Sequence, residues 1–345
     1  MGPRDRRHVV SHSRILVLLQ QRLREPVVPD PRGFITGIGT GCWYVAESGA
    51  IMSLAPTGAR GKYLALWIVS RNLGQLSPVR LPAFPLEKVV RSDGTRILVS
   101  EKLRTREEFK LIRFTMSSRL ILLSALWALW SFFYSGTWST YLGIYFTTRA
   151  RSLSSLISPF FCIVGCFGLG FILDLKGVSQ RRRAQIGLWT VVILNAGVYI
   201  WSIIMQVRFN RHAPGHIDWD EPLYPTAFLP YFLVQTTGPL SQSYMYWLLS
   251  SFATDAQANV RNGAAFRCLE AIGQAISYGM NTQIQTSPLI GFIVSFALMG
   301  ACLGPMIVLV NSTPDRIPAD VALEEQEIAH AEKVGDFKGA KGQEV

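Results

Sequence analysis

The sequence contains little charge for its length. Asp, Glu, Lys and Arg make up 17% of its 345 residues, whereas they make up about 25% of a soluble domain. The charges also gather in clusters, and the stretches between the clusters are long and apolar. This pattern argues against a soluble globular protein and favours one whose helices cross a lipid bilayer.

Sequence signatures of catalytic and metal sites are lacking. The five cysteines include no CxxC pair and no Cys/His cluster with the spacing of metal ligands. The five histidines lie in the terminal segments and in one connection. No P-loop, HExxH or nucleophile-elbow motif occurs. We therefore expect no enzymatic activity, no metal and no cofactor.

What the sequence does contain is a series of apolar segments of roughly 20 residues, the length with which a helix crosses a bilayer core of about 30 Å. The predicted spans are 33–54, 120–145, 153–175, 186–207, 224–252, 259–282 and 289–310, of which the last six are consecutive. Segment 63–73 is apolar as well, but Arg71 and Asn72 interrupt it. We expect a helix there that ends early.

Basic residues set the expected orientation. The formal net charge is +11, and Lys and Arg lie mainly in connections, most densely at 77–118 and 176–183. Two spans separate these connections, so both lie on one face, which the positive-inside rule assigns to the cytoplasm. Basic residues that lie mainly in the connections indicate a membrane topology. We therefore expect the protein to contact a lipid bilayer and to bind no nucleic acid.

Several strings of residues resemble one family. GIGTGCWYVAESGAIM at 37–52 resembles the fourth helix of the Unc-ninety-three-like branch of the major facilitator superfamily, fungal type, and RGKYLALWIVSRNLG at 60–74 resembles the next helix. FFYSGTWSTYLGIYFTTRARSLSS at 132–155 is similar to the seventh helix, and RNGAAFRCLEAIGQAISYGMNT at 261–282 to the eleventh. These likenesses extend over most of the chain.

The resemblance implies an all-α polytopic membrane bundle of the major facilitator type, with a complete C-terminal six-helix half and an incomplete N-terminal half. We expect an unrelated or misassigned leader at 1–32, a remnant of the N-terminal bundle at 33–76, a basic cytoplasmic linker at 77–118, the six-helix bundle at 119–311 and an acidic cytoplasmic tail at 312–345. Counterparts of helices one to three and six are missing, so we expect a truncated gene model. A genuine half-transporter that acts with a partner is the alternative.

The function implied by the resemblance is secondary transport of a small solute by alternating access, with little or no transport by this chain alone. The other hypothesis is a non-transporting membrane protein that regulates or escorts another membrane protein.

One predicted span carries an unusual set of polar residues. Arg267 and Glu270 are three residues apart, share a helix face and can pair, and Gln274 and Asn281 extend the stripe. Ionisable groups inside membranes are costly and often functional, so the stripe is a candidate substrate or ion pathway in which Glu270 couples proton movement. An internal ion pair that only holds helices together is the alternative. Glu47 is a further pathway candidate; a partner on one of the missing helices would also explain it.

A second candidate feature covers the end of the predicted span 153–175 and the basic connection that follows it. It comprises Gly170, Asp174, Gly177, Arg181, Arg182 and Arg183. These residues resemble the superfamily's cytoplasmic Gly/Asp/Arg loop. The resemblance implies an acidic residue that pairs with basic residues or a helix end in one conformation and separates from them in another. A purely basic anchor on the cytoplasmic face is the alternative.

Overall fold

The computed structural model describes residues 47, 52, 60–76, 105–253, 255–283 and 287–315. All regular elements of this part of the chain are helices, accompanied by an isolated bridge between Phe146 and Ile217. The predicted leader, the predicted span 33–54 except for Glu47 and Met52, most of the linker and most of the tail lie outside the described residues. The prediction of an all-α polytopic membrane bundle is confirmed, whereas the proposed division into five segments stays a prediction.

Within the described residues, four helical segments are long and apolar enough to cross a membrane: Arg119–Tyr145, Thr148–Leu173, Gln180–Arg211 and Leu289–Asn311. The last three are α7, α8 and α11. Helices α9, Tyr224–Ser250, and α10, Ala256–Gln283, have similar lengths but carry more polar residues. A helix of 27 residues is about 40 Å long, which exceeds the bilayer core of about 30 Å.

The predicted span 120–145 is interrupted, which corrects the expectation of one continuous helix. Helix α5 covers Arg119–Ser131 and α6 covers Tyr134–Tyr145, with a turn at Phe132 and Phe133 between them. The Ser135 hydroxyl donates to the Phe132 carbonyl at 2.9 Å, and the Ser277 hydroxyl of α10 donates to the Phe133 carbonyl. Side chains therefore satisfy carbonyl groups at the break, as an irregular backbone at membrane depth requires.

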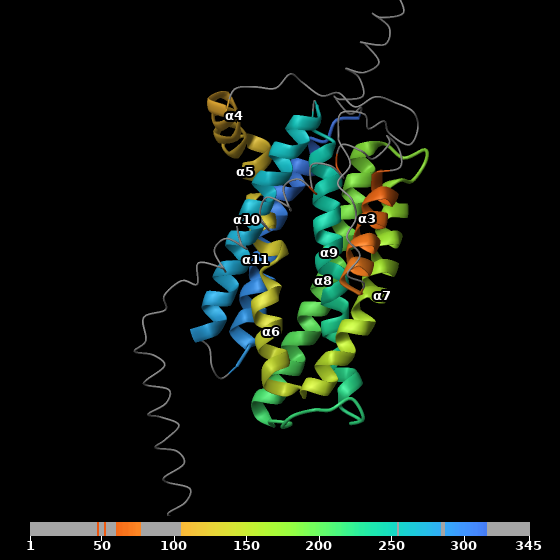
Figure 1. The fold of residues 1–345 in the computed structure, drawn as a ribbon, viewed down its shortest axis with the longest axis vertical. Helices are drawn as coiled ribbons and strands as arrows, with labels where there is room; N and C mark the ends of the chain where they lie inside the picture. Colours follow the sequence, from red (N-terminus) through yellow and green to blue (C-terminus); the bar gives the residue numbers. More distant parts are fainter. Residues whose placement is uncertain are drawn as a thin grey trace, which may run out of the picture. The chain divides into compact units, whose positions relative to one another are not determined.

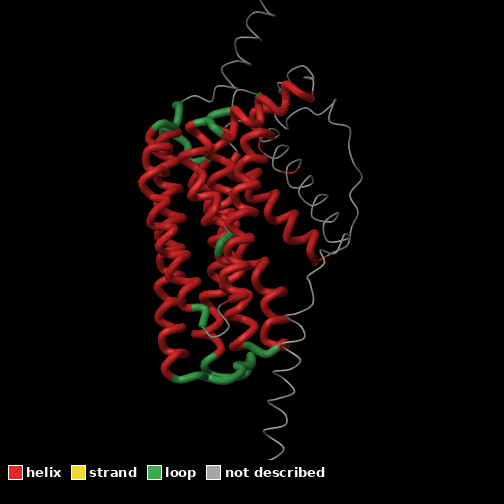
Figure 2. The backbone as a smooth tube through the Cα atoms, turned by 90° about the vertical axis from the view of Figure 1, so that its left-hand side faces the viewer, coloured by secondary structure: helices red, strands yellow, loops and turns green. Residues whose placement is uncertain are grey.

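The helices pack in a defined order of neighbours. Helix α10 packs against α5 and α6, α7 packs against α3 and α9, and α8 lies between α9 and α11. Figure 1 shows these elements side by side, and Figure 2 shows that the axes of the long helices are nearly aligned with one another. Aromatic and aliphatic side chains from several of these helices fill the core, including Trp127, Tyr199 and Tyr244.

Two elements differ from the sequence-based expectation. Helix α3 covers Arg60–Leu76, so it begins earlier and ends later than the predicted segment 63–73, and it continues through Arg71 and Asn72. Its Leu64 and Ile68 are buried in the core, which explains how packing sustains the helix past its polar residues. Helix α4, Thr105–Met116, which was not predicted, lies in the predicted cytoplasmic linker, and at 12 residues it is too short to cross a bilayer.

The close contact of α10 with α5 depends on a glycine. A Cβ atom at Gly273 would lie 2.0 Å from the carbonyl oxygen of Leu129, which is a backbone atom that cannot rotate away. Small residues allow membrane helices to approach in this way. The separation of α5 and α10 is therefore set at Gly273.

We expect Gly273→Ala to destabilise the protein by about 1–3 kcal/mol, because the added methyl group forces the two backbones apart. Thermal unfolding in detergent would show this as a lower midpoint. Gly279→Ala is the matched control on the same helix, since a Cβ there meets nothing within 4 Å. Equal midpoints for the two variants would contradict the packing described here.

Candidate functional site

An ion pair lies buried within the helical bundle. Arg267 and Glu270 of α10 are one turn apart, and the distance from Arg267 Nη1 to Glu270 Oε2 is 2.9 Å. Their side chains are 11% and 3% exposed. The pairing predicted from the spacing of these two residues is present, and neither charge is screened by bulk water.

Two further helices provide polar partners for Glu270. Ser131 Oγ, at the end of α5, lies 2.8 Å from Glu270 Oε1, and Gln242 Nε2 of α9 donates to Glu270 Oε2 at 3.1 Å. Both partner side chains are buried. The Glu270 carboxylate thus joins α5, α9 and α10. Its contact on α5, Ser131, lies directly before the break between α5 and α6.

Aromatic rings and a second carboxylate surround Arg267. Its guanidinium lies 5.8 Å from the ring centroids of Phe132, at the helix break, and Tyr246 of α9, distances at which the ring faces attract a cation. Glu47 also contributes attractive charge at Arg267. Trp67 Nε1 of α3 donates to Glu47 Oε1 at 2.7 Å, and the Trp67 ring packs against Tyr246. Glu47 is therefore held by a residue of this chain.

The rest of the predicted polar stripe does not reach this ion pair. Asn281 is buried and donates to Thr137 of α6 at 3.2 Å and to the Ser277 carbonyl at 2.7 Å. Gln274 is half-buried, and none of the hydrogen bonds found among the described residues includes it. The stripe therefore contacts α5 through Glu270 and α6 through Asn281, and these two contacts lie on either side of the helix break.

Several residues of this site were missed by the sequence analysis. Ser277 lies seven residues after Glu270, a spacing that places it on the same helix face and could have added it to the stripe. Ser131 and Gln242 are single polar residues in apolar spans, and only the tertiary contact with Glu270 distinguishes them. In the part of the chain that the structure describes, no group of three or more His, Cys, Asp or Glu residues could hold a metal ion.

The second predicted feature is a contact between α7 and α3. Asp174 caps the end of α7, and its two carboxylate oxygens accept the N–H groups of Gly61 and Lys62, each at 2.9 Å. These are first-turn amides of α3, which a carboxylate stabilises as an N-cap does. Burial raises the pKa of Asp174, while the two N–H groups, Lys62 and Arg183 act to lower it.

Glycine makes this contact between the helices feasible. A Cβ atom at Gly170 would lie 2.7 Å from the Gly61 carbonyl oxygen, and one at Gly61 would lie 2.6 Å from the Gly170 carbonyl oxygen. Gly177 has φ of 75°, a value that favours glycine, in the turn that leads to α8. The three positions thus have backbone roles.

The three consecutive arginines lie in the first turn of α8, not in a loop, because Ser179 caps this helix and α8 begins at Gln180. Arg183 Nη1 donates to the Leu173 carbonyl at 3.1 Å at the end of α7. Arg181 and Arg182 are exposed. The structure therefore brings Arg183 alone of the three to the contact made by Asp174.

Comparison with known proteins places this architecture among membrane proteins. No family model and no solved structure matches the chain. The chain is 27% identical over 306 residues to the Notoamide biosynthesis cluster protein O' of Aspergillus versicolor, covering 79% of this chain and 66% of that protein.

Two relatives carry the family name. The chain is 22% identical to UNC93-like protein 1 of Arabidopsis thaliana, covering 73% of this chain and 63% of the relative. It is 25% identical to UNC93-like protein C922.05c of Schizosaccharomyces pombe, covering 73% of this chain and 59% of that protein. The chain thus spans less than two thirds of the length of these relatives. With its bundle of apolar helices, the chain is a polytopic membrane protein similar to the UNC93-like proteins over about 73% of its length.

Proposed function

We propose that this protein takes part in secondary transport of a small solute across a membrane and catalyses no reaction. The observation that carries the proposal is the buried Arg267–Glu270 ion pair, which joins three helices beside a break in a membrane-spanning segment. Transporters of several folds place substrate and coupling-ion sites near such interrupted helices. Ionisable groups that remain inside a membrane despite their cost are candidates for this role.

The charges around Arg267 support proton coupling. Two carboxylates, Glu47 and Glu270, act on one guanidinium. If both were ionised, the group would carry one excess negative charge in a region of low dielectric, and uptake of a proton by Glu270 removes it. An anionic solute that competes for Arg267, or a proton that binds Glu270, would break the ion pair, and this change can shift the conformation of the bundle.

The Asp174 contact is the element that we propose to have two states. While the carboxylate accepts the amides of Gly61 and Lys62, α3 is fixed against α7. Release of these hydrogen bonds would free α3 to move as a rigid helix, as alternating access requires. We propose that Asp174, Gly170 and Arg183 together act as a conformational switch.

The transported species is proposed only as a small solute. One relative is named as a protein of the notoamide biosynthesis cluster, a name that is compatible with movement of an organic compound. The chain covers 59–66% of the relatives' lengths, so the activity of a two-bundle transporter is a proposal about the whole architecture of this group.

The proposal predicts that Glu270 exchanges a proton with bulk water. Infrared difference spectra of the protein in liposomes should show a protonated carboxyl band that grows as the pH falls. This band should be absent from Glu270→Gln and shifted in Glu47→Gln, because the two acids share Arg267. Replacing the exposed Glu221 with Gln is the control, since it leaves the bundle unchanged.

A Glu270 that gives no titrating band between pH 4 and 9 would count against proton-coupled transport. The ion pair would then be a permanent structural contact. A membrane protein that regulates or escorts another membrane protein would become the better account of the function.

The switch proposal predicts that Asp174→Ala loosens the start of α3. Loss of a cap costs about 0.5–2 kcal/mol, so amide hydrogen exchange at residues 61–65 should become faster by up to about an order of magnitude. Asp220→Ala, which removes an exposed acid from a different connection, should leave this exchange unchanged. Unaltered exchange in Asp174→Ala would show that the contact does not hold α3.

A further inference from the structure

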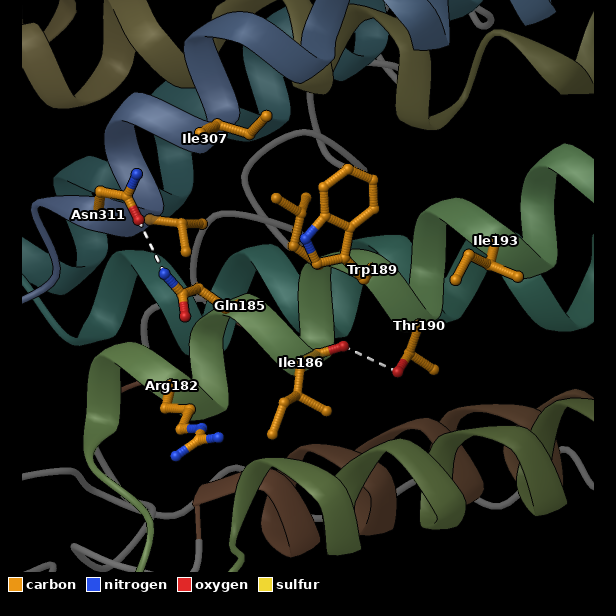
Figure 3. Close-up of a pocket in the computed structure, with 10 residues that line it drawn as sticks. Arg182, Gln185, Ile186, Trp189, Thr190, Ile193, Ile307 and Asn311 are labelled. Carbon is orange, nitrogen blue, oxygen red and sulfur yellow. Dashed lines mark hydrogen bonds between the residues drawn. The ribbon is translucent and has the colours of Figure 1, made fainter.

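A groove runs along the outer seam between α8 and α11. Its volume is about 580 Å³, and the described residues that line it belong to these two helices. Arg182, Gln185, Trp189 and Ile193 of α8 and Ile307 and Asn311 of α11 are among the residues that line it. Figure 3 shows Arg182 at one end of the groove, the Trp189 ring in the middle and Ile193 toward the other end. The groove is separate from the Arg267–Glu270 site.

The two ends of the groove differ in chemistry. At one end, Arg182 is exposed, and among the described residues no ion pair includes it. Beside it, Gln185 Nε2 donates to Asn311 Oδ1 at 2.9 Å and joins the two helices (Figure 3). This leaves N–H groups of both amides for another acceptor. A cation and amide donors together suit a phosphate group.

The remainder of the groove is apolar and exposed. Trp189 is 46% exposed, Ile193 66% and Ile307 38%, although they belong to two of the membrane-spanning helices. Arg182 and Ile193 are three turns apart on α8, a distance of about 16 Å. One leaflet of the hydrocarbon core is about half of 30 Å thick. The apolar wall therefore matches the depth of one leaflet.

We propose that this groove binds one anionic phospholipid of the cytoplasmic leaflet. Its phosphate contacts Arg182 and the Gln185–Asn311 amides, and an acyl chain lies along Trp189 toward Ile193. Charge complementarity supports this occupant, since Arg181–Arg183 form the first turn of α8 on the face that the positive-inside rule assigns to the cytoplasm. Basic pockets between helices on this side of a membrane suit acidic headgroups. The proposal does not depend on transport activity.

Native mass spectrometry of the full chain, titrated with dioleoyl phosphatidylserine or dioleoyl phosphatidylcholine, tests this proposal. Both lipids carry the phosphate, but only phosphatidylserine keeps a net negative charge beside Arg182, so we expect the anionic lipid to bind more tightly by about fivefold. Arg182→Gln should abolish the preference. Arg181→Gln is the matched control, because it removes the same charge from the adjacent residue, which is not among the residues that line the groove. This variant should retain the preference for the anionic lipid.

The acyl chain is tested separately. Trp189→Ala should weaken binding of both lipids by a similar factor, whereas Trp219→Ala, which removes an equally exposed ring from the connection between α8 and α9, should weaken neither. Soluble glycerophosphoserine should not compete at concentrations where the intact lipid saturates. Three results would each overturn the proposal: no preference for the anionic lipid, equal loss in Arg181→Gln and Arg182→Gln, or full competition by the soluble headgroup.

Discussion

A charge buried among membrane helices must find its partners within the protein, because lipid offers neither water nor hydrogen bonds. Glu270, with a side chain only 3% exposed, meets this requirement through Arg267, Ser131 and Gln242. These partners bring α5 and α9 against α10. Movement of any of the three helices would leave a charge or a polar group without a partner, so the ion pair couples their positions.

The other features of the bundle are arranged around this coupling. The break between α5 and α6 lies directly after Ser131, and Phe132 at the break contributes a ring face to Arg267. Helix α3 reaches the same site through Trp67, while its first turn is held to α7 by Asp174. A change at the ion pair therefore has a physical route to α3, through the contact of Trp67 with Tyr246 beside Arg267.

Much of the fold could be predicted because the bilayer imposes a length and a hydropathy on each span, and the Arg267–Glu270 pair followed from its spacing. The break after Ser131 was not predicted, since no proline marks it. The extent of α3 was underestimated because burial of Leu64 and Ile68 compensates for the polar residues that follow. The partners Ser131 and Gln242 come from distant segments, and spacing within one helix carries no information about them.

The coupling between Arg267 and Glu270 is the central claim, and a double-mutant cycle on thermal stability tests it most directly. Arg267→Met and Glu270→Gln should each destabilise the protein, because removal of one member of a buried ion pair costs about 3–5 kcal/mol. The double variant should be more stable than the sum of the two losses predicts, because no unpaired charge is left between these positions. Strictly additive losses would show that the two residues do not act as a pair, and would contradict this account of the bundle.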